Sequence, residues 1–158
     1  MTYIGIDNGV SGTIGIISPD GVVFESTPVK SEQNYTKKKG NITRVDVVEL
    51  YRLLDGYDSV MCLIERPMVN PGRFKATLSA IRSLEATLNV LEMLQYPYQY
   101  IDSKEWQREL LPKGVKGEEL KTSSRDIGTR LFPSFRDVIH KHKDADGLLI
   151  AEYAKRNF

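Results

Sequence analysis

The residues best suited to chemistry in this sequence are three carboxylates that stand next to apolar segments. Asp7 follows the mostly apolar residues 3–6, Glu65 follows residues 60–64, and Asp146 comes shortly before residues 148–151. A charged carboxylate beside a buried segment needs a partner, because burying an unpaired charge is costly. If two carboxylates lie close together, one must take up a proton unless a cation lies between them. Such oxygen ligands suit a hard divalent cation, and a pair of these ions suits phosphodiester hydrolysis.

Each of these acids also has an ordinary structural explanation when it is considered alone. Asp7 could be a turn residue beside Gly9, Glu65 could pair with a nearby arginine, and Asp146 could cap a helix. The hypothesis of a shared site therefore depends on a fold that brings the three segments together.

The hydrophobic pattern predicts such a fold. Strands are expected at residues 3–7, 13–17, 21–29, 59–65 and 97–101. Helices are expected near residues 45–56, 76–94, 103–111, 116–131 and 144–155. Three strands followed by alternating helices and strands predict an α/β fold, with a five-stranded mixed sheet and helices on both faces, as in the ribonuclease H-like fold. If the first and fourth strands are neighbours, Asp7 and Glu65 lie together at the carboxyl edge of the sheet, where α/β proteins place their sites.

The composition fits one globular domain over residues 1–158, with 41% hydrophobic and 27% charged residues and a net charge of +1. No segment approaches the roughly 20 apolar residues of a membrane span, and no signal peptide precedes the first strand. The single cysteine, Cys62, fits a reducing compartment. We therefore expect no membrane partner and a cytoplasmic location. The polar, lysine-rich residues 31–41 are expected to form a loop that orders on binding.

The acidic segments resemble a known family. Residues 4–12, 63–67 and 144–151 resemble the three acidic motifs of the RuvC-type junction resolvases, in the family's order and over nearly the whole chain. Residues 106–110, 117–121 and 131–134 are similar to the phage and plastid branch of that family. The resemblance implies a homodimer that resolves four-way (Holliday) DNA junctions by paired cuts, using Mg²⁺ or Mn²⁺, two ions per site, and no organic cofactor. It also implies a nucleoid-associated protein or one of a phage-infected cell, with an organelle matrix as the alternative.

The resemblance also implies site residues, with one departure from the family pattern. Asp7, Glu65 and Asp146 are expected to bind the metal and support catalysis. Many relatives carry an aspartate three residues before the last acid, where this chain has Lys143. We expect His142, one helical turn before Asp146, to serve as the remaining ligand in preference to Asp144.

Lys121 lies in a region from which the family often places a lysine near the scissile phosphate, where its charge would stabilise the transition state. A surface lysine is the alternative explanation.

Local basic clusters and the loop after Glu65 supply the expected DNA contacts. Phe74 and Met68 could wedge between bases at an opened junction, or they could pack into the core. The full set of expected DNA-binding residues is Lys37, Lys38, Lys39, Arg66, Met68, Arg73, Phe74, Lys75, Lys116, Lys141 and Lys143.

The long helix expected at residues 76–94 carries more apolar surface than one sheet contact needs. Ile81, Leu84, Leu88 and Leu91 form a stripe expected to pack on the sheet. A second apolar set widens this stripe and favours a helix-mediated twofold dimer, which the resemblance also implies; it consists of Leu78, Ala80, Val90 and Leu94.

Three other functions compete with junction resolution. A ribonuclease H-like nuclease acting on RNA–DNA hybrids or other branched nucleic acid would use the same acids. An actin- or hexokinase-type phosphotransferase would share the glycine-rich residues 7–12, but it needs a second lobe that 158 residues do not supply. A non-catalytic DNA-binding module would leave the three acids without a function.

Overall fold

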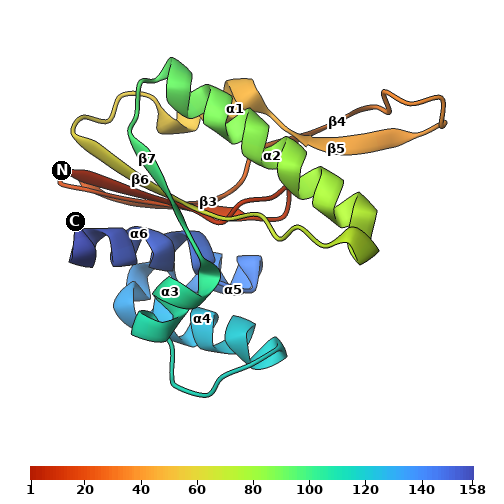
Figure 1. The fold of residues 1–158 in the computed structure, drawn as a ribbon. Helices are drawn as coiled ribbons and strands as arrows, with labels where there is room; N and C mark the ends of the chain where they lie inside the picture. Colours follow the sequence, from red (N-terminus) through yellow and green to blue (C-terminus); the bar gives the residue numbers. More distant parts are fainter.

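A five-stranded mixed sheet forms the centre of the computed structural model, which describes residues 1–158 (Figure 1). The strands are β1 (Thr2–Ile6), β2 (Thr13–Ser18), β3 (Gly21–Ser26), β6 (Val60–Glu65) and β7 (Tyr98–Ile101), in the spatial order β3-β2-β1-β6-β7. The first three strands are antiparallel, and β6 pairs parallel with both β1 and β7. The predicted α/β fold is confirmed, including the neighbouring positions of the first and fourth predicted strands.

Helices cover both faces of this sheet (Figure 1). One face carries α1 (Val47–Leu54) and the long α2 (Phe74–Met93). The other carries α6 (Asp146–Asn157), with α3 (Ser103–Leu110), α4 (Glu118–Leu131) and α5 (Arg136–His142) around it. Short 3₁₀ turns, η1 (Pro71–Arg73) and η2 (Pro133–Phe135), precede α2 and α5. The two faces therefore enclose two hydrophobic cores, one on each side of the sheet.

Three glycines let α6 lie directly on the central strands. Gly5 of β1 and Gly15 of β2 are register partners, and a Cβ atom added to Gly5 would stand 2.2 Å from the backbone nitrogen of Ala151. A Cβ atom added to Gly147 would stand 2.4 Å from the carbonyl oxygen of Thr13. Because no side chain separates the backbones here, the N-terminus of α6 reaches the end of β1.

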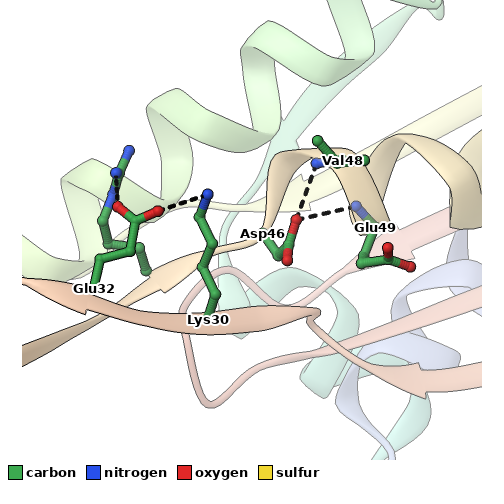
Figure 2. A network of polar contacts seen from close by, with 6 residues as sticks. Lys30, Glu32, Asp46, Val48 and Glu49 are labelled. Atoms are coloured by element: carbon green, nitrogen blue, oxygen red, sulfur yellow. Dashed lines mark hydrogen bonds and ion pairs between the residues drawn. The ribbon is translucent and has the colours of Figure 1, made fainter.

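The predicted strand 21–29 is too long, and the predicted loop 31–41 is confirmed only for residues 34–40. The third strand of the sheet ends at Ser26, and a separate hairpin follows, made of β4 (Val29–Gln33) and β5 (Asn41–Val45). Charge pairing supports this polar hairpin, since the Glu32 carboxylate accepts hydrogen bonds from Lys30 and Arg44 (Figure 2). These hydrogen bonds, from Lys30 first and then Arg44, lower the pKa of Glu32.

The helix predicted from residue 45 begins instead at Val47. Asp46 caps it by accepting hydrogen bonds from the backbone nitrogens of Val48 and Glu49, each at 3.2 Å (Figure 2). The preceding residue, Val45, still belongs to β5. A carboxylate cap therefore separates the strand from the helix.

The predicted sheet-facing stripe of α2 is confirmed except at Ile81, since Leu91 is buried and Leu84 and Leu88 are half-buried against the same core. The buried residues of this helix are Ser83, Thr87, Val90 and Leu91, whereas Ile81 is 41% exposed. The hydroxyls of Ser83 and Thr87 donate to carbonyls one turn earlier at 2.9 Å, so both polar side chains can face the sheet without an unpaired group. The buried side of α2 is therefore partly polar, and Val90, which the sequence placed on the dimer face, belongs to the core.

The C-terminal helices differ from the prediction in one place that matters for the site. The sequence did not predict α5, and the last helix begins at Asp146 rather than at residue 144. Lys143 adopts a left-handed conformation, with φ of 74°, and separates α5 from α6. None of the helices is long and apolar enough to cross a membrane.

Candidate metal centre

Three carboxylates from two segments converge at the carboxyl end of β1. Asp7 directly follows this strand, Asp146 is the first residue of α6, and Asp144 lies two residues earlier. One carboxylate oxygen from each lies within 4.8 Å of the other two. This convergence follows from the glycine contacts described above, because they bring the start of α6 to the end of the strand.

Side chains from α4 and β2 fix the acidic turn before α6. The hydroxyl of Ser124 donates to Oδ1 of Asp146 at 2.5 Å and accepts from the backbone nitrogen of Ala145 at 3.0 Å. The backbone nitrogen of Gly147 donates to Oγ1 of Thr13 at 3.0 Å. The positions of the two aspartates in this turn are thus set by elements far apart in the sequence.

Glu65 lies on the neighbouring strand at the same edge of the sheet. The register pairs Ile6 with Ile64, so the next residues, Asp7 and Glu65, stand at adjacent strand ends. Oε2 of Glu65 accepts a hydrogen bond from the indole nitrogen of the fully buried Trp106 at 2.8 Å. This hydrogen bond orients the Glu65 carboxylate. Glu65 is close enough to raise the pKa of Asp7, but it is not one of the three converging acids.

Burial and mutual repulsion raise the pKa values of these acids. Burial and then the charge of Asp146 raise the pKa of Asp7 well above its ordinary value. Burial and then Asp144 raise the pKa of Asp146 to about 7, against an opposing hydrogen bond from Ser124. Burial is also the main cause of the raised pKa of Glu65. Such a cluster must hold protons or a cation at neutral pH, and its oxygen-only donors fit Mg²⁺ or Mn²⁺.

The structure does not place His142 with these acids, so the preference for it over Asp144 is not supported. Its Nδ1 atom lies 2.9 Å from the hydroxyl of Ser26, and its ring packs edge-on against Phe24 with 5.1 Å between centroids. The left-handed Lys143 ends the helix, so His142 is not one turn before Asp146 on a continuous helix. Asp144 is buried and supplies the third carboxylate of the cluster, beside Asp7 and Asp146.

Lys121 lies on α4, one turn before Ser124, and its side chain is exposed. Its charge lowers the pKa of Asp7 and of Asp146. Lys121 is therefore close enough to act on both acids electrostatically, although it forms no ion pair with either of them.

The expected DNA-binding residues lie in several places. Arg66, Met68 and Arg73 line a cleft of about 780 Å³ beside Glu65. Exposed residues of the hairpin and α2 line a second groove, of about 750 Å³: Lys37, Lys38, Phe74 and Lys75. Lys39 lies at the hairpin tip, Lys116 before α4, and Lys141 and Lys143 beside His142, all of them exposed.

The core-packing explanation for Phe74 and Met68 is wrong, since these side chains are 71% and 74% exposed. Both lie in the segment that joins β6 to the body of α2. They are available to a partner rather than committed to the core.

Sequence reasoning missed several residues around the acids. Ser124 and Trp106 contact the carboxylates, and Lys104 and Arg108 of α3 add two cations to the cleft. Asn8 lies there too, and its side-chain nitrogen donates to the carbonyl oxygen of Ala80 on α2 at 3.1 Å. Only Ser124 had a sequence signal, its spacing of three residues from Lys121 on one helix.

Comparison with known proteins supports the fold. No family model matches the sequence, and no curated protein matches it. A solved structure of T. thermophilus RuvC in complex with a Holliday junction substrate has a TM-score of 0.60 and 12% identity, covering 99% of this chain and 96% of the other. Another Thermus thermophilus RuvC structure has a TM-score of 0.50 and 17% identity, with the same coverage. The chain therefore has a RuvC-type, ribonuclease H-like fold, with a carboxylate cluster at the carboxyl end of its central strands.

Proposed function

We propose that this chain is a divalent-metal-dependent endonuclease that cuts four-way DNA junctions. The observation that carries the proposal is the convergence of Asp7, Asp144 and Asp146, with Glu65 on the next strand. One protein of the same fold was solved with a Holliday junction substrate. A buried acidic cluster of this kind is unfavourable for stability, which argues that it is retained for a cation and a phosphate.

The four acids are the proposed ligands of Mg²⁺ or Mn²⁺, two ions per site. Bound ions of this class neutralise charge on a scissile phosphate and activate the attacking water. Asp144 and Asp146 are held by the hydroxyl of Ser124 and the turn before α6, so their oxygens need little rearrangement to accept a cation. Glu65 is held in turn by Trp106.

The cations around the acids have a separate proposed role. Lys121 is positioned to stabilise negative charge that develops on the phosphate during cleavage. Arg66 and Arg73 in the cleft would bind flanking phosphates. Arg66 already forms a 3.0 Å ion pair with Asp102, which orients its guanidinium toward the cleft wall.

A homodimer is part of the same proposal, because paired cuts in a junction require two active sites. Two exposed apolar side chains of α2 line neither the cleft beside Glu65 nor the second groove: Ile81 and Met93, at 41% and 60% exposure. A twofold contact through this part of α2 would cover them. A DNA substrate implies work in the compartment that holds DNA, which we take to be the cytoplasm.

A cleavage assay with three labelled substrates tests the proposal. The wild-type protein in Mg²⁺ is expected to cut a four-way junction symmetrically and to leave linear duplex and RNA–DNA hybrid intact. The matched control is Asp7→Asn, which should abolish cleavage yet retain junction binding, because removing negative charge lowers repulsion toward phosphates. Cutting of the hybrid alone would instead favour the alternative, a hybrid-specific nuclease with the same acids.

A further inference from the structure

A groove between the hairpin β4–β5 and the first two turns of α2 lies apart from the acidic cluster. We call it the hairpin groove; its main lining residues are Tyr35, Lys37, Lys38, Phe74, Lys75 and Arg82. Its volume is about 750 Å³, and its lining contains four cations and no carboxylate. The cleft beside Glu65 is lined by other residues of α2, Thr77 and Ala80, so the two hollows lie on opposite flanks of the helix.

One side-chain hydrogen bond joins the hairpin to α2, in addition to the packing of Val45 in the same core as Val90 and Leu91. The guanidinium of Arg82 donates a hydrogen bond to the hydroxyl of Tyr35 at 2.9 Å, and it also lies 5.5 Å from the centroid of that ring. Arg82 has no ion-pair partner within 4 Å. Its guanidinium therefore forms no ion pair with a protein acid, and Arg82 lines the groove.

Exposed aromatic rings stand among these cations. Phe74 is 71% exposed and Tyr35 is 62% exposed, although rings of this size usually bury much of their surface. Cations combined with exposed rings are the means by which proteins bind unpaired nucleotides, since bases stack on the rings and phosphates pair with the cations. A paired duplex offers its phosphates but not its base faces, so it could use only half of this surface.

We propose that the hairpin groove binds unpaired DNA nucleotides that leave the branch point of the substrate, and that Arg82 and Tyr35 are positioning residues that keep the groove formed. The proposal rests on the proposed action on branched DNA and adds a second DNA site to it. Charge complementarity selects this occupant, because an acid-free lining with four cations fits a polyanion better than an uncharged protein surface.

Binding of a short single-stranded oligonucleotide, compared with a duplex of the same length, tests the proposal directly. The probes are a fluorescent 12-nucleotide thymidine oligomer and a 12-base-pair duplex, without divalent metal. The double variant Tyr35→Phe/Arg82→Gln should weaken single-strand binding about tenfold and change duplex binding less than about twofold. Arg52→Gln is the matched control, because Arg52 is exposed on α1, pairs with Glu49 and lies outside the groove.

A second variant guards against a folding artefact. Phe74→Ala removes a ring that is 71% exposed and should also weaken single-strand binding selectively, with an unchanged melting temperature, because only unpaired bases can stack on this ring. Absence of single-strand binding by the wild-type protein, or an equal loss for both probes, would overturn the proposal. Unchanged DNA binding together with loss of dimers in sedimentation would assign the groove to a second copy of the chain.

These outcomes are separate from the proposed function. A protein that fails to prefer or cut four-way junctions, yet loses single-strand binding selectively in both groove variants, would refute junction resolution while leaving the groove assignment intact.

Discussion

Replacing Asp146 by asparagine should make the metal-free protein more stable at neutral and alkaline pH while it abolishes cleavage. Asp146 lies in the acidic cluster, where burial and then Asp144 raise its pKa from the ordinary 3.8 to about 7. Asparagine is nearly the same size and keeps an oxygen that accepts from the hydroxyl of Ser124. The substitution therefore removes a buried charge and leaves the packing of the turn in place.

The sign and size of the effect follow from the pKa values. A carboxyl group whose pKa is raised in the folded state holds a proton that the unfolded state has released, so the free energy of unfolding falls as pH rises from about 4 to about 7. At about 1.36 kcal/mol per pH unit, the difference between 3.8 and about 7 corresponds to about 4 kcal/mol at pH 8. Because Asp144 and Asp7 share this repulsion, we expect Asp146→Asn to gain about 2–4 kcal/mol at pH 8 and almost nothing at pH 4.

Urea unfolding followed by circular dichroism, in a chelator at pH 4, 6 and 8, measures this gain. Asp126→Asn is the control, since Asp126 is an aspartate of α4 that is 67% exposed. This substitution should change the free energy of unfolding by less than about 0.5 kcal/mol. Added Mg²⁺ should stabilise the wild type more than Asp146→Asn, because a ligand that binds only the folded state raises its stability. A gain that is the same at all three pH values would refute the argument from buried charge.

Three further changes test other parts of the structure. Gly5→Ala should destabilise the protein by about 3 kcal/mol in calorimetry, because its Cβ would lie 2.2 Å from the backbone of Ala151; an unchanged melting temperature would contradict the close contact. Trp106→Phe removes the hydrogen bond that lowers the pKa of Glu65, so the acidic limb of the pH–rate profile should move to higher pH, and an unmoved limb would count against this role. Lys121→Gln should lower kcat about 100-fold with junction affinity nearly unchanged; a loss of affinity alone would make it a binding residue.

Much of the fold could be predicted because its central strands are short apolar runs bounded by turns. Residues 60–64 are apolar on both faces, which indicates a strand covered on both sides, and β6 is such a strand. The hairpin could not be predicted in the same way, since β4 and β5 bury little apolar surface and one charge pair, between Glu32 and Arg44, joins the two strands. The buried face of α2 was predicted only in part, because Ser83 and Thr87 satisfy their hydroxyls within the helix and can be buried in place of apolar residues.

The members of the candidate site were predicted better from acids at the ends of strands than from the number of residues between two side chains. Asp7 and Glu65 could be placed together because they end two strands that the expected fold makes neighbours. The choice of His142 failed because it assumed one continuous helix, and a left-handed Lys143 is not visible in the hydrophobic pattern. Trp106 is separated from Glu65 by 41 residues, so this contact appears only once the chain has folded.

The packing of the sheet and the electrostatic strain of the cluster have one structural origin. Gly5 and Gly147 let the backbone of α6 contact β1 and β2 directly. Asp146 directly precedes Gly147, at the end of α6 that reaches the site. The buried contacts that hold α6 on the sheet thus force Asp146 toward Asp7, although the two carboxylates repel. A chain that needed only stability would replace one of these acids by an amide, since the packing would be unaffected. This chain has both acids at the end of a well-packed strand. We therefore infer that the cluster serves to bind a cation and not to stabilise the fold.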